Sequence, residues 1–236
     1  MAVSFLVVSD VINLISLFYF VFRMAHNPPA VARLDIMDRL GMLAVDENRV
    51  YGGSKQQGGI TSETISEENR DFADLIARDR SHPSVLTWSY CNEVGCNNET
   101  SASFFQAIAR EMDPYRPVTQ NHLGTNKSTR YLDVQGFSHK STAVYDSFHK
   151  QYPKKPMLAT ECCSCMSQRG IDQDVCPHPQ DGGCVNGPSV SPGTFYNNNI
   201  GKCTAQQVIE SDSPDYVAGT FVWYVYFSFS LALFWF

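Results

Sequence analysis

The sequence repeats one pattern along most of its length: a short apolar run ends in polar residues, and an amphipathic stretch follows it. Residues 42–48 (MLAVDEN), 84–93 (SVLTWSYCNE) and 155–161 (KPMLATE) are clear examples of such runs. Apolar runs of strand length that alternate with amphipathic stretches of helix length are typical of βα units. The pattern therefore predicts an α/β fold built on a parallel sheet.

The alternation allows the individual elements to be assigned. Proline at the start and glycine at the end suit a helix over residues 30–41, with Gly41 as its exit. We expect a long Gly/Pro/Asn/Cys-rich loop over about residues 162–200. The other predicted helices are 66–81, 103–113, 141–152 and 205–211, and the predicted strands after residue 41 are 42–48, 84–90, 116–122, 131–139, 155–161 and 216–226.

Polar and charged side chains gather where the predicted strands end: Arg23, His26, Glu47, Glu93, His122, His139 and Glu161. Parallel strands with polar carboxyl ends predict a (β/α)8 TIM barrel with its site on that face. A doubly wound sheet does the same at its switch point but rarely needs so many strands. We expect Trp88 to fill the barrel.

The chain is short for this fold. We count about seven strands from residue 21 onward, whereas the fold needs eight and typically about 250 residues. We therefore predict an incomplete barrel, with the first strand–helix unit and the last helix missing or replaced. Such a gap leaves two strand edges unpaired.

Both ends of the chain are strongly apolar. Residues 1–22 have the length of a bilayer span and precede the first basic residue, Arg23, so they are either a signal anchor that contacts a membrane or a segment foreign to the fold. The predicted barrel domain spans residues 23–226. The apolar C-terminal stretch 221–236 is a buried strand, a membrane-seeking tail or a segment foreign to the fold. We favour the strand only for residues 221–226 and treat 227–236 as an apolar tail.

The net charge and the cysteine content limit which partners and which cellular compartment the chain is expected to have. The net charge is −6 and no basic stripe is present, which argues against nucleic acid. Eight cysteines and two Asn-X-Ser/Thr sequons favour the secretory pathway or a membrane over the cytoplasm. The CCSC run is not a regular zinc pattern, so we expect no metal. No cofactor is expected, and the oligomeric state is not defined.

Two carboxylates stand out within this pattern. Glu93 and Glu161 each follow an apolar strand, so in one barrel they share a cleft. Two carboxyl groups in a cleft are the groups needed for glycoside hydrolysis, one as acid/base and the other as nucleophile or base. The alternative is that they form structural ion pairs with Arg or Lys.

Five ordered segments resemble the catalytic barrel of glycoside hydrolase family 2, which includes β-galactosidases, β-glucuronidases and β-mannosidases. These segments, within residues 21–226, are RMAHNPP (23–29), DRLGMLAVDEN (38–48), HPSVLTWSYCNE (82–93), KPMLATE (155–161) and GTFVWY (219–224). The resemblance implies a retaining mechanism, with Glu93 as acid/base and Glu161 as nucleophile.

The resemblance also implies roles for other residues. Asn92 matches an asparagine that hydrogen-bonds the sugar 2-OH, and Trp223 matches a tryptophan that floors the subsite, although it could equally be core. His26 matches a position near the glycone, and Arg23 one beneath the nucleophile.

Three further residues have open interpretations. Arg23 and Glu47 could instead form a structural ion pair. His122 is either a sugar contact or a satisfied loop histidine. His139 stands where the family often has a tyrosine bonded to the nucleophile, so it is a candidate donor to Glu161.

The predicted function is retaining hydrolysis of β-glycosides, of the β-galactosidase type, with a carbohydrate as partner. Family members normally carry a jelly-roll and an immunoglobulin-like domain before the barrel, and neither fits into 20 residues. One alternative is a non-catalytic carbohydrate-binding or pseudoenzyme fragment of the same family. Another is a membrane-anchored cysteine-rich protein.

Overall fold

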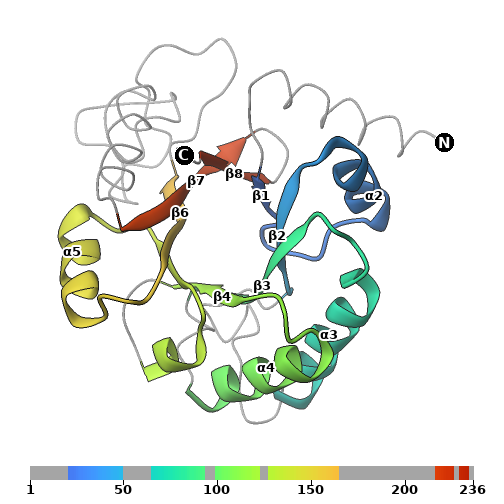
Figure 1. Cartoon of the computed structure of the whole chain (residues 1–236), viewed down its shortest axis with the longest axis horizontal. Coiled ribbons are helices and arrows are strands. Elements are labelled where there is room, and N and C mark those ends of the chain that lie inside the picture. Colours follow the sequence, from blue (N-terminus) through green and yellow to red (C-terminus); the bar gives the residue numbers. More distant parts are fainter. Residues whose placement is uncertain are drawn as a thin grey trace, which may run out of the picture.

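A computed structural model describes residues 21–49, 65–93, 99–122, 127–164, 216–225 and 229–233. Strands and helices alternate along most of this chain (Figure 1). In order they are β1 (Val21–Arg23), α2 (Val31–Leu40), β2 (Leu43–Glu47), α3 (Ile65–Asp79), β3 (Val85–Asn92), α4 (Glu99–Met112), β4 (Val118–Asn121), the 3-10 helix η2 (Lys127–Tyr131), β5 (Gln135–Ser138), α5 (Thr142–Gln151), β6 (Met157–Ser164), β7 (Val217–Val225) and β8 (Phe229–Leu233).

The strands form one eight-stranded sheet in the order β4-β3-β2-β1-β8-β7-β6-β5. Neighbours within β1–β4 and within β5–β7 run parallel. The two outer strands of this order also meet, through a parallel bridge between His122 and Phe137, and the Ser138 N–H donates to the His122 carbonyl at 2.7 Å. Figure 1 shows the strands in a ring with α2 to α5 outside it, the arrangement of a TIM barrel.

The barrel is incomplete as a (β/α)8 fold, because β8 runs antiparallel to both of its neighbours. Phe22 of β1 pairs with Leu231, and Phe221 of β7 pairs with Ala232. The expectation that two strand edges lack partners is therefore wrong. The apolar tail supplies a strand that pairs with both edges. In the described part of the chain no helix follows β6 or β7.

The predicted elements that fall in the described ranges are confirmed. The first helix ends as its sequence indicated: Gly41 adopts a left-handed φ of 69°, and its N–H bonds the Met37 carbonyl. The predicted helix at 205–211 and most of the predicted loop at 162–200 lie outside the described residues.

The N-terminal apolar segment is described only at its end, where residues 21 and 22 belong to β1. Residues 1–20 lie outside the described part. None of the described helices combines the length and apolar character that a membrane crossing requires.

The core divides into layers around the ring. The largest cluster lies between β1–β4 and the helices and includes Phe72 of α3, Trp88 of β3 and Phe105 of α4. A small cluster joins strands across the barrel through Val45 of β2 and Phe221 of β7. Burying such apolar side chains is the main driving force for folding.

Trp88 does not fill the barrel, contrary to expectation. It belongs to the cluster under the helices, and its Nε1 donates to the Asp113 carboxylate beyond α4 at 3.1 Å. The pairing of β3 shifts register with both neighbours, at Ala44/Val45 and at Ser89/Asn92. Such irregularities change which side chains face inward, so simple alternation mispredicts this residue.

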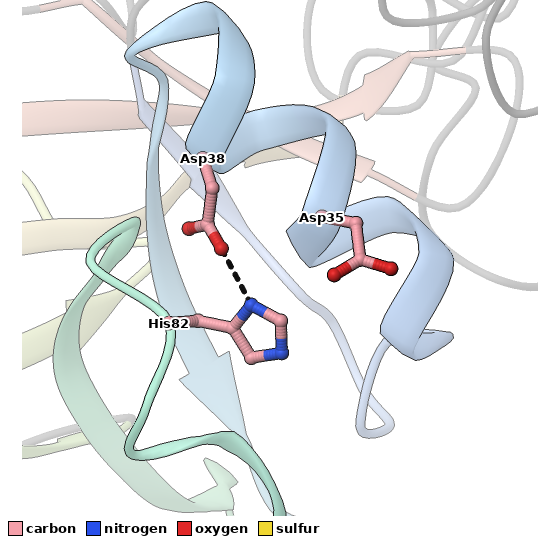
Figure 2. A group of neighbouring side chains, drawn as sticks. All are labelled: Asp35, Asp38 and His82. Carbon is pink, nitrogen blue, oxygen red and sulfur yellow. Dashed lines mark hydrogen bonds and ion pairs between the residues drawn. The ribbon is translucent and has the colours of Figure 1, made fainter.

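A polar contact fixes the start of β3 (Figure 2). His82 Nδ1 lies 2.6 Å from Asp38 Oδ2, and the Ser84 N–H donates to Asp38 Oδ1 at 2.9 Å. Burial alone would raise the pKa of Asp38, but the bonds from Ser84 and His82 bring it below its usual range. The contact ties α2 to the strand that leads to Glu93.

Candidate active site

The carboxyl ends of the strands bring seven polar residues to one end of the barrel: Arg23 from β1, Glu47 from β2, Asn92 from β3, Asn121 from β4, Ser138 from β5, Glu161 from β6, and Glu93 directly after β3. Each of these side chains contacts another member of the set. Active sites of TIM barrels lie at this face. The prediction that strand-end polar residues converge is confirmed for the described strands.

Arg23 is the centre of the cluster. Its side chain is fully buried and donates from Nε and Nη2 to the two oxygens of Glu47, both at 2.7 Å. It also donates from Nη1 to Glu161 Oε2 at 3.1 Å and from Nη2 to Asn92 Oδ1 at 2.8 Å. Burial would lower the pKa of Arg23, but the Glu47 and Glu161 carboxylates raise it overall. The guanidinium therefore stays charged and holds three acceptor side chains in place, those of Glu47, Glu161 and Asn92.

Glu161 is an almost fully buried carboxylate that its neighbours keep ionised. Its Oε2 accepts from Arg23 and, at 3.0 Å, from Asn121 Nδ2, while Oε1 lies 2.9 Å from His139 Nε2. Burial alone would raise the pKa of Glu161. The His139 hydrogen bond and the Arg23 charge outweigh burial and lower it. A buried carboxylate with such donors is ready to act as a nucleophile or base.

Glu93 is more accessible than Glu161. About a quarter of its side chain is exposed, and Oε1 accepts a hydrogen bond from the Ser138 hydroxyl at 2.9 Å. His139 Nε2 lies 3.7 Å from the same oxygen. One carboxylate oxygen of Glu93 lies within 4.8 Å of one of Glu161. The two carboxyl groups therefore lie beside each other at this end of the barrel.

The amides of Asn92 and Asn121 interlock beside Glu161. Asn92 Oδ1 accepts from both Arg23 and Asn121 Nδ2, which fixes the orientation of its amide. The Thr160 hydroxyl donates in turn to Asn121 Oδ1. Since both donors bind Asn92 through oxygen, Nδ2 is the atom it can offer to a ligand.

The remaining predicted site residues lie at or near this face to different degrees. His26 Nδ1 lies 3.1 Å from Glu47 Oε1 and 3.2 Å from Arg23 Nη2, so it belongs to the cluster. His122 follows β4, is 5% exposed and joins β4 to β5 through its backbone. Trp223 lies on β7, paired with Ser164 and Ser230, but its side chain is outside the described part.

Three contacts came from residues that the sequence reasoning did not select. Asn121 and Ser138 bind the two carboxylates, and the Ser89 hydroxyl donates to Glu47 Oε2 at 2.9 Å. Asn121 and Ser138 are the last residues of their strands. That position was the available signal, but a neutral amide or hydroxyl does not by itself suggest chemistry.

Among the described residues, two groups of side chains each place three potential metal-ligating atoms within 4.8 Å of one another. The first is Asp35, Asp38 and His82, and the second is Glu93, His139 and Glu161. In the first, Asp38 already bonds His82 and Ser84 and fixes a loop (Figure 2). In the second, Glu161 is bonded by His139, Arg23 and Asn121. Internal hydrogen bonds account for both groups, and we interpret neither as a metal centre.

Cys91, directly before Asn92, is buried and disulfide-bonded. It lies in the cluster of core side chains under the helices. At least two of the eight cysteines are therefore paired, as one interpretation of the sequence proposed.

Sequence comparison places the chain among known proteins. Residues 3–176 match the family described as "Glycosyl hydrolases family 2, TIM barrel domain". The chain is 28% identical to a β-galactosidase of Bacteroides ovatus, over 63% of this chain and 22% of the relative. It is 32% identical to a β-glucuronidase of Paenibacillus borealis, over 42% of this chain and 18% of the relative.

Solved structures agree on the fold. A family 2 member from Bacteroides cellulosilyticus aligns with a TM-score of 0.52 at 30% identity, covering 60% of this chain and 19% of that one. A β-galacturonidase from Eisenbergiella tayi, bound to galacturonate, aligns with a TM-score of 0.72 over 92% of this chain and 39% of that one. At 19% identity the second likeness concerns the fold alone. The chain spans about a fifth of the first two curated relatives.

Proposed function

This chain belongs to glycosyl hydrolase family 2, and on that premise we propose that it cleaves β-glycosidic O-linkages with retention of configuration, in the manner of a β-galactosidase. The observation that carries the proposal is the pair Glu93 and Glu161, whose nearest oxygens lie within 4.8 Å. Retaining glycosidases hold their carboxyl groups about 5–5.5 Å apart, whereas inverting ones separate them by about 6.5–9.5 Å.

Glu161 is assigned the nucleophile. Arg23 and Asn121 hold its Oε2, and the His139 hydrogen bond and the Arg23 charge keep the carboxylate ionised, so that Oε1 is the oxygen left to attack. In the first step Oε1 attacks the anomeric carbon, the bond to the leaving oxygen breaks, and a glycosyl ester forms on Glu161. The fixed guanidinium stabilises the anion again when the ester is hydrolysed.

Glu93 is assigned the acid/base. It is the more exposed of the two carboxyl groups and receives one hydroxyl hydrogen bond, from Ser138. It donates its proton to the leaving oxygen in the first step. In the second step it removes a proton from the water that attacks the ester, and both groups return to their starting states.

Asn92 is assigned the contact with the sugar 2-OH. Its Oδ1 is engaged by Arg23 and Asn121, so its Nδ2 is oriented and available to donate. A hydrogen bond to the 2-OH that strengthens in the transition state adds to catalysis. Trp223, His26, His122 and His139 complete the proposed carbohydrate contacts.

The proposal is tested on this chain with aryl β-galactosides, β-glucuronides and β-mannosides. Glu161→Gln should lower kcat by about 100-fold or more, because the glycosyl ester can no longer form. Glu93→Gln should lose activity toward sugars with poor leaving groups but keep much of its first step with dinitrophenyl glycosides, which need no protonation. The released sugar, followed by NMR, should appear first as the β-anomer.

A matched control makes the same chemical change elsewhere. Glu111 is an exposed carboxylate on α4, so Glu111→Gln should leave kcat and KM unchanged. Activity that survives both Glu93→Gln and Glu161→Gln would refute the assignment of the pair. Sugar binding without turnover in the unaltered chain would favour a non-catalytic carbohydrate-binding fragment instead.

A further inference from the structure

His139 is tied to Glu161 at two points. Its backbone N–H donates to the Glu161 carbonyl at 2.6 Å, and its Nε2 lies 2.9 Å from Glu161 Oε1. The ring therefore cannot move independently of the strand that carries the carboxylate. Its side chain is about one fifth exposed.

The backbone at His139 is strained in a way that favours this contact. Its φ is +51°, in the left-handed region that residues other than glycine seldom adopt. A residue in this region costs of order 1–3 kcal/mol and persists only where its surroundings enforce it. Here the two contacts with Glu161 enforce it, and the strained turn holds the ring against the carboxylate.

The donors around Glu161 are divided between its two oxygens. Oε2 accepts from Arg23 and Asn121, whereas Oε1, among the described residues, has His139 as its hydrogen-bond partner. The charges near the two oxygens also differ. The positive charge of Arg23 is balanced by its bidentate contact with Glu47, whereas His139 adds a positive charge only when its ring is protonated. Among the described residues, Glu93 also faces His139, with its Oε1 at 3.7 Å from Nε2.

We propose that His139 is a positioning residue that orients Oε1 of Glu161 and, as an imidazolium, extends the pH range over which this carboxylate stays ionised. The inference depends on the proposed function in one respect: that this pH range limits catalysis. A neutral donor at this position would orient Oε1 equally well but would add no charge. The imidazolium therefore places a positive charge next to Oε1 that a neutral donor does not supply.

Within the described part of the cluster, His26 and Glu47 are also titratable, and both contact Arg23. His26 contacts Glu47 and Arg23 but is not hydrogen-bonded to Glu161 in the described structure. Its charge still acts on Glu161 at longer range, because it contributes to the lowered pKa of that carboxyl after His139 and Arg23. His139 is thus the histidine that directly contacts the proposed nucleophile in the described structure.

The test compares two variants at this position. His139→Gln offers a neutral N–H donor, and His139→Phe offers none. The Glu161 carboxyl is titrated by 13C NMR, its signal being identified by its absence from Glu161→Gln. Its apparent pKa should rise in His139→Gln and rise further in His139→Phe. The acid limb of kcat/KM should move to higher pH in the same order, so that the loss of activity grows as pH falls.

His149→Gln is the matched control, since His149 lies on α5 and stacks on Tyr216, away from the cluster. It should leave the Glu161 titration unchanged. An unshifted Glu161 titration in His139→Gln and in a folded His139→Phe would overturn the inference. If Glu161 shifts as expected while the unaltered chain hydrolyses no glycoside, the role of His139 holds and the proposed function fails.

Discussion

The substitution Arg23→Lys tests whether one buried guanidinium holds the site end of the barrel together. Arg23 makes five hydrogen bonds with named partners, two to Glu47 and one each to Glu161, Asn92 and the Thr160 carbonyl. Lysine keeps the charge but concentrates its donors on one nitrogen. That nitrogen cannot reach both oxygens of Glu47 and also Glu161, so at least one carboxylate loses its partner.

The expected loss of stability depends on which buried carboxylates are left without a partner. Hydrogen bonds to charged groups contribute about 1.5–3 kcal/mol each, and removing one partner of a buried ion pair typically costs about 3–5 kcal/mol. Glu47 and Glu161 are 0% and 4% exposed, so water does not replace the lost donors. We expect Arg23→Lys to lower the free energy of unfolding by about 3–5 kcal/mol, a large part of the total stability of a typical domain.

Urea unfolding followed by circular dichroism measures this loss. Arg39→Lys is the matched control, because Arg39 is exposed in the last turn of α2 and should change stability by less than about 0.5 kcal/mol. A double substitution, Arg23→Met with Glu47→Gln, should be less damaging than the sum of its parts. If Arg23→Lys unfolds at the same urea concentration as the unaltered chain, the reasoning is refuted.

Three other predictions concern stability. Gly136→Ala should destabilise the chain by more than about 4 kcal/mol, because the added Cβ would lie 1.8 Å from the Gln120 carbonyl of the neighbouring strand; a near-normal urea midpoint would contradict that close approach. Folding lowers the pKa of Glu161, so ionisation of this carboxyl stabilises the fold at pH values above its pKa in the unfolded chain. This stabilisation is lost as the pH falls through the pKa of Glu161 in the folded chain. Glu161→Gln should therefore flatten the acid side of a melting temperature–pH curve, and an unchanged slope would disprove the linkage. Trp88→Phe should cost about 1–2 kcal/mol in urea unfolding, since Asp113 loses its indole donor; an additive loss in the double variant with Asp113→Asn would show that the bond does not contribute.

Much of the fold could be predicted because it depends on local pattern. Apolar runs followed by Glu47, Glu93 and Glu161 indicate both the parallel sheet and the face that carries the site, because parallel strands present their carboxyl ends together. Gly41 was predictable for a similar reason, since its left-handed conformation suits glycine.

The features that were missed depend on tertiary geometry. Trp88 was assigned to the wrong side of β3 because the register shifts there are invisible in the sequence. Asn121 and Ser138 were not chosen because their importance comes from the carboxylates that other strands bring to them. The direction of β8 was unpredictable, since an evenly apolar segment pairs in either orientation.

The antiparallel strand β8 has a consequence for how the chain reaches its native state. β1 is the first described strand and its partner β8 the last, so among the described strand pairings this one closes the largest loop. Contacts so distant in sequence form late and slow folding, because the entropy of loop closure opposes them. Until β8 docks, the edges of β1 and β7 are available to other chains, so aggregation during refolding should compete with this final pairing.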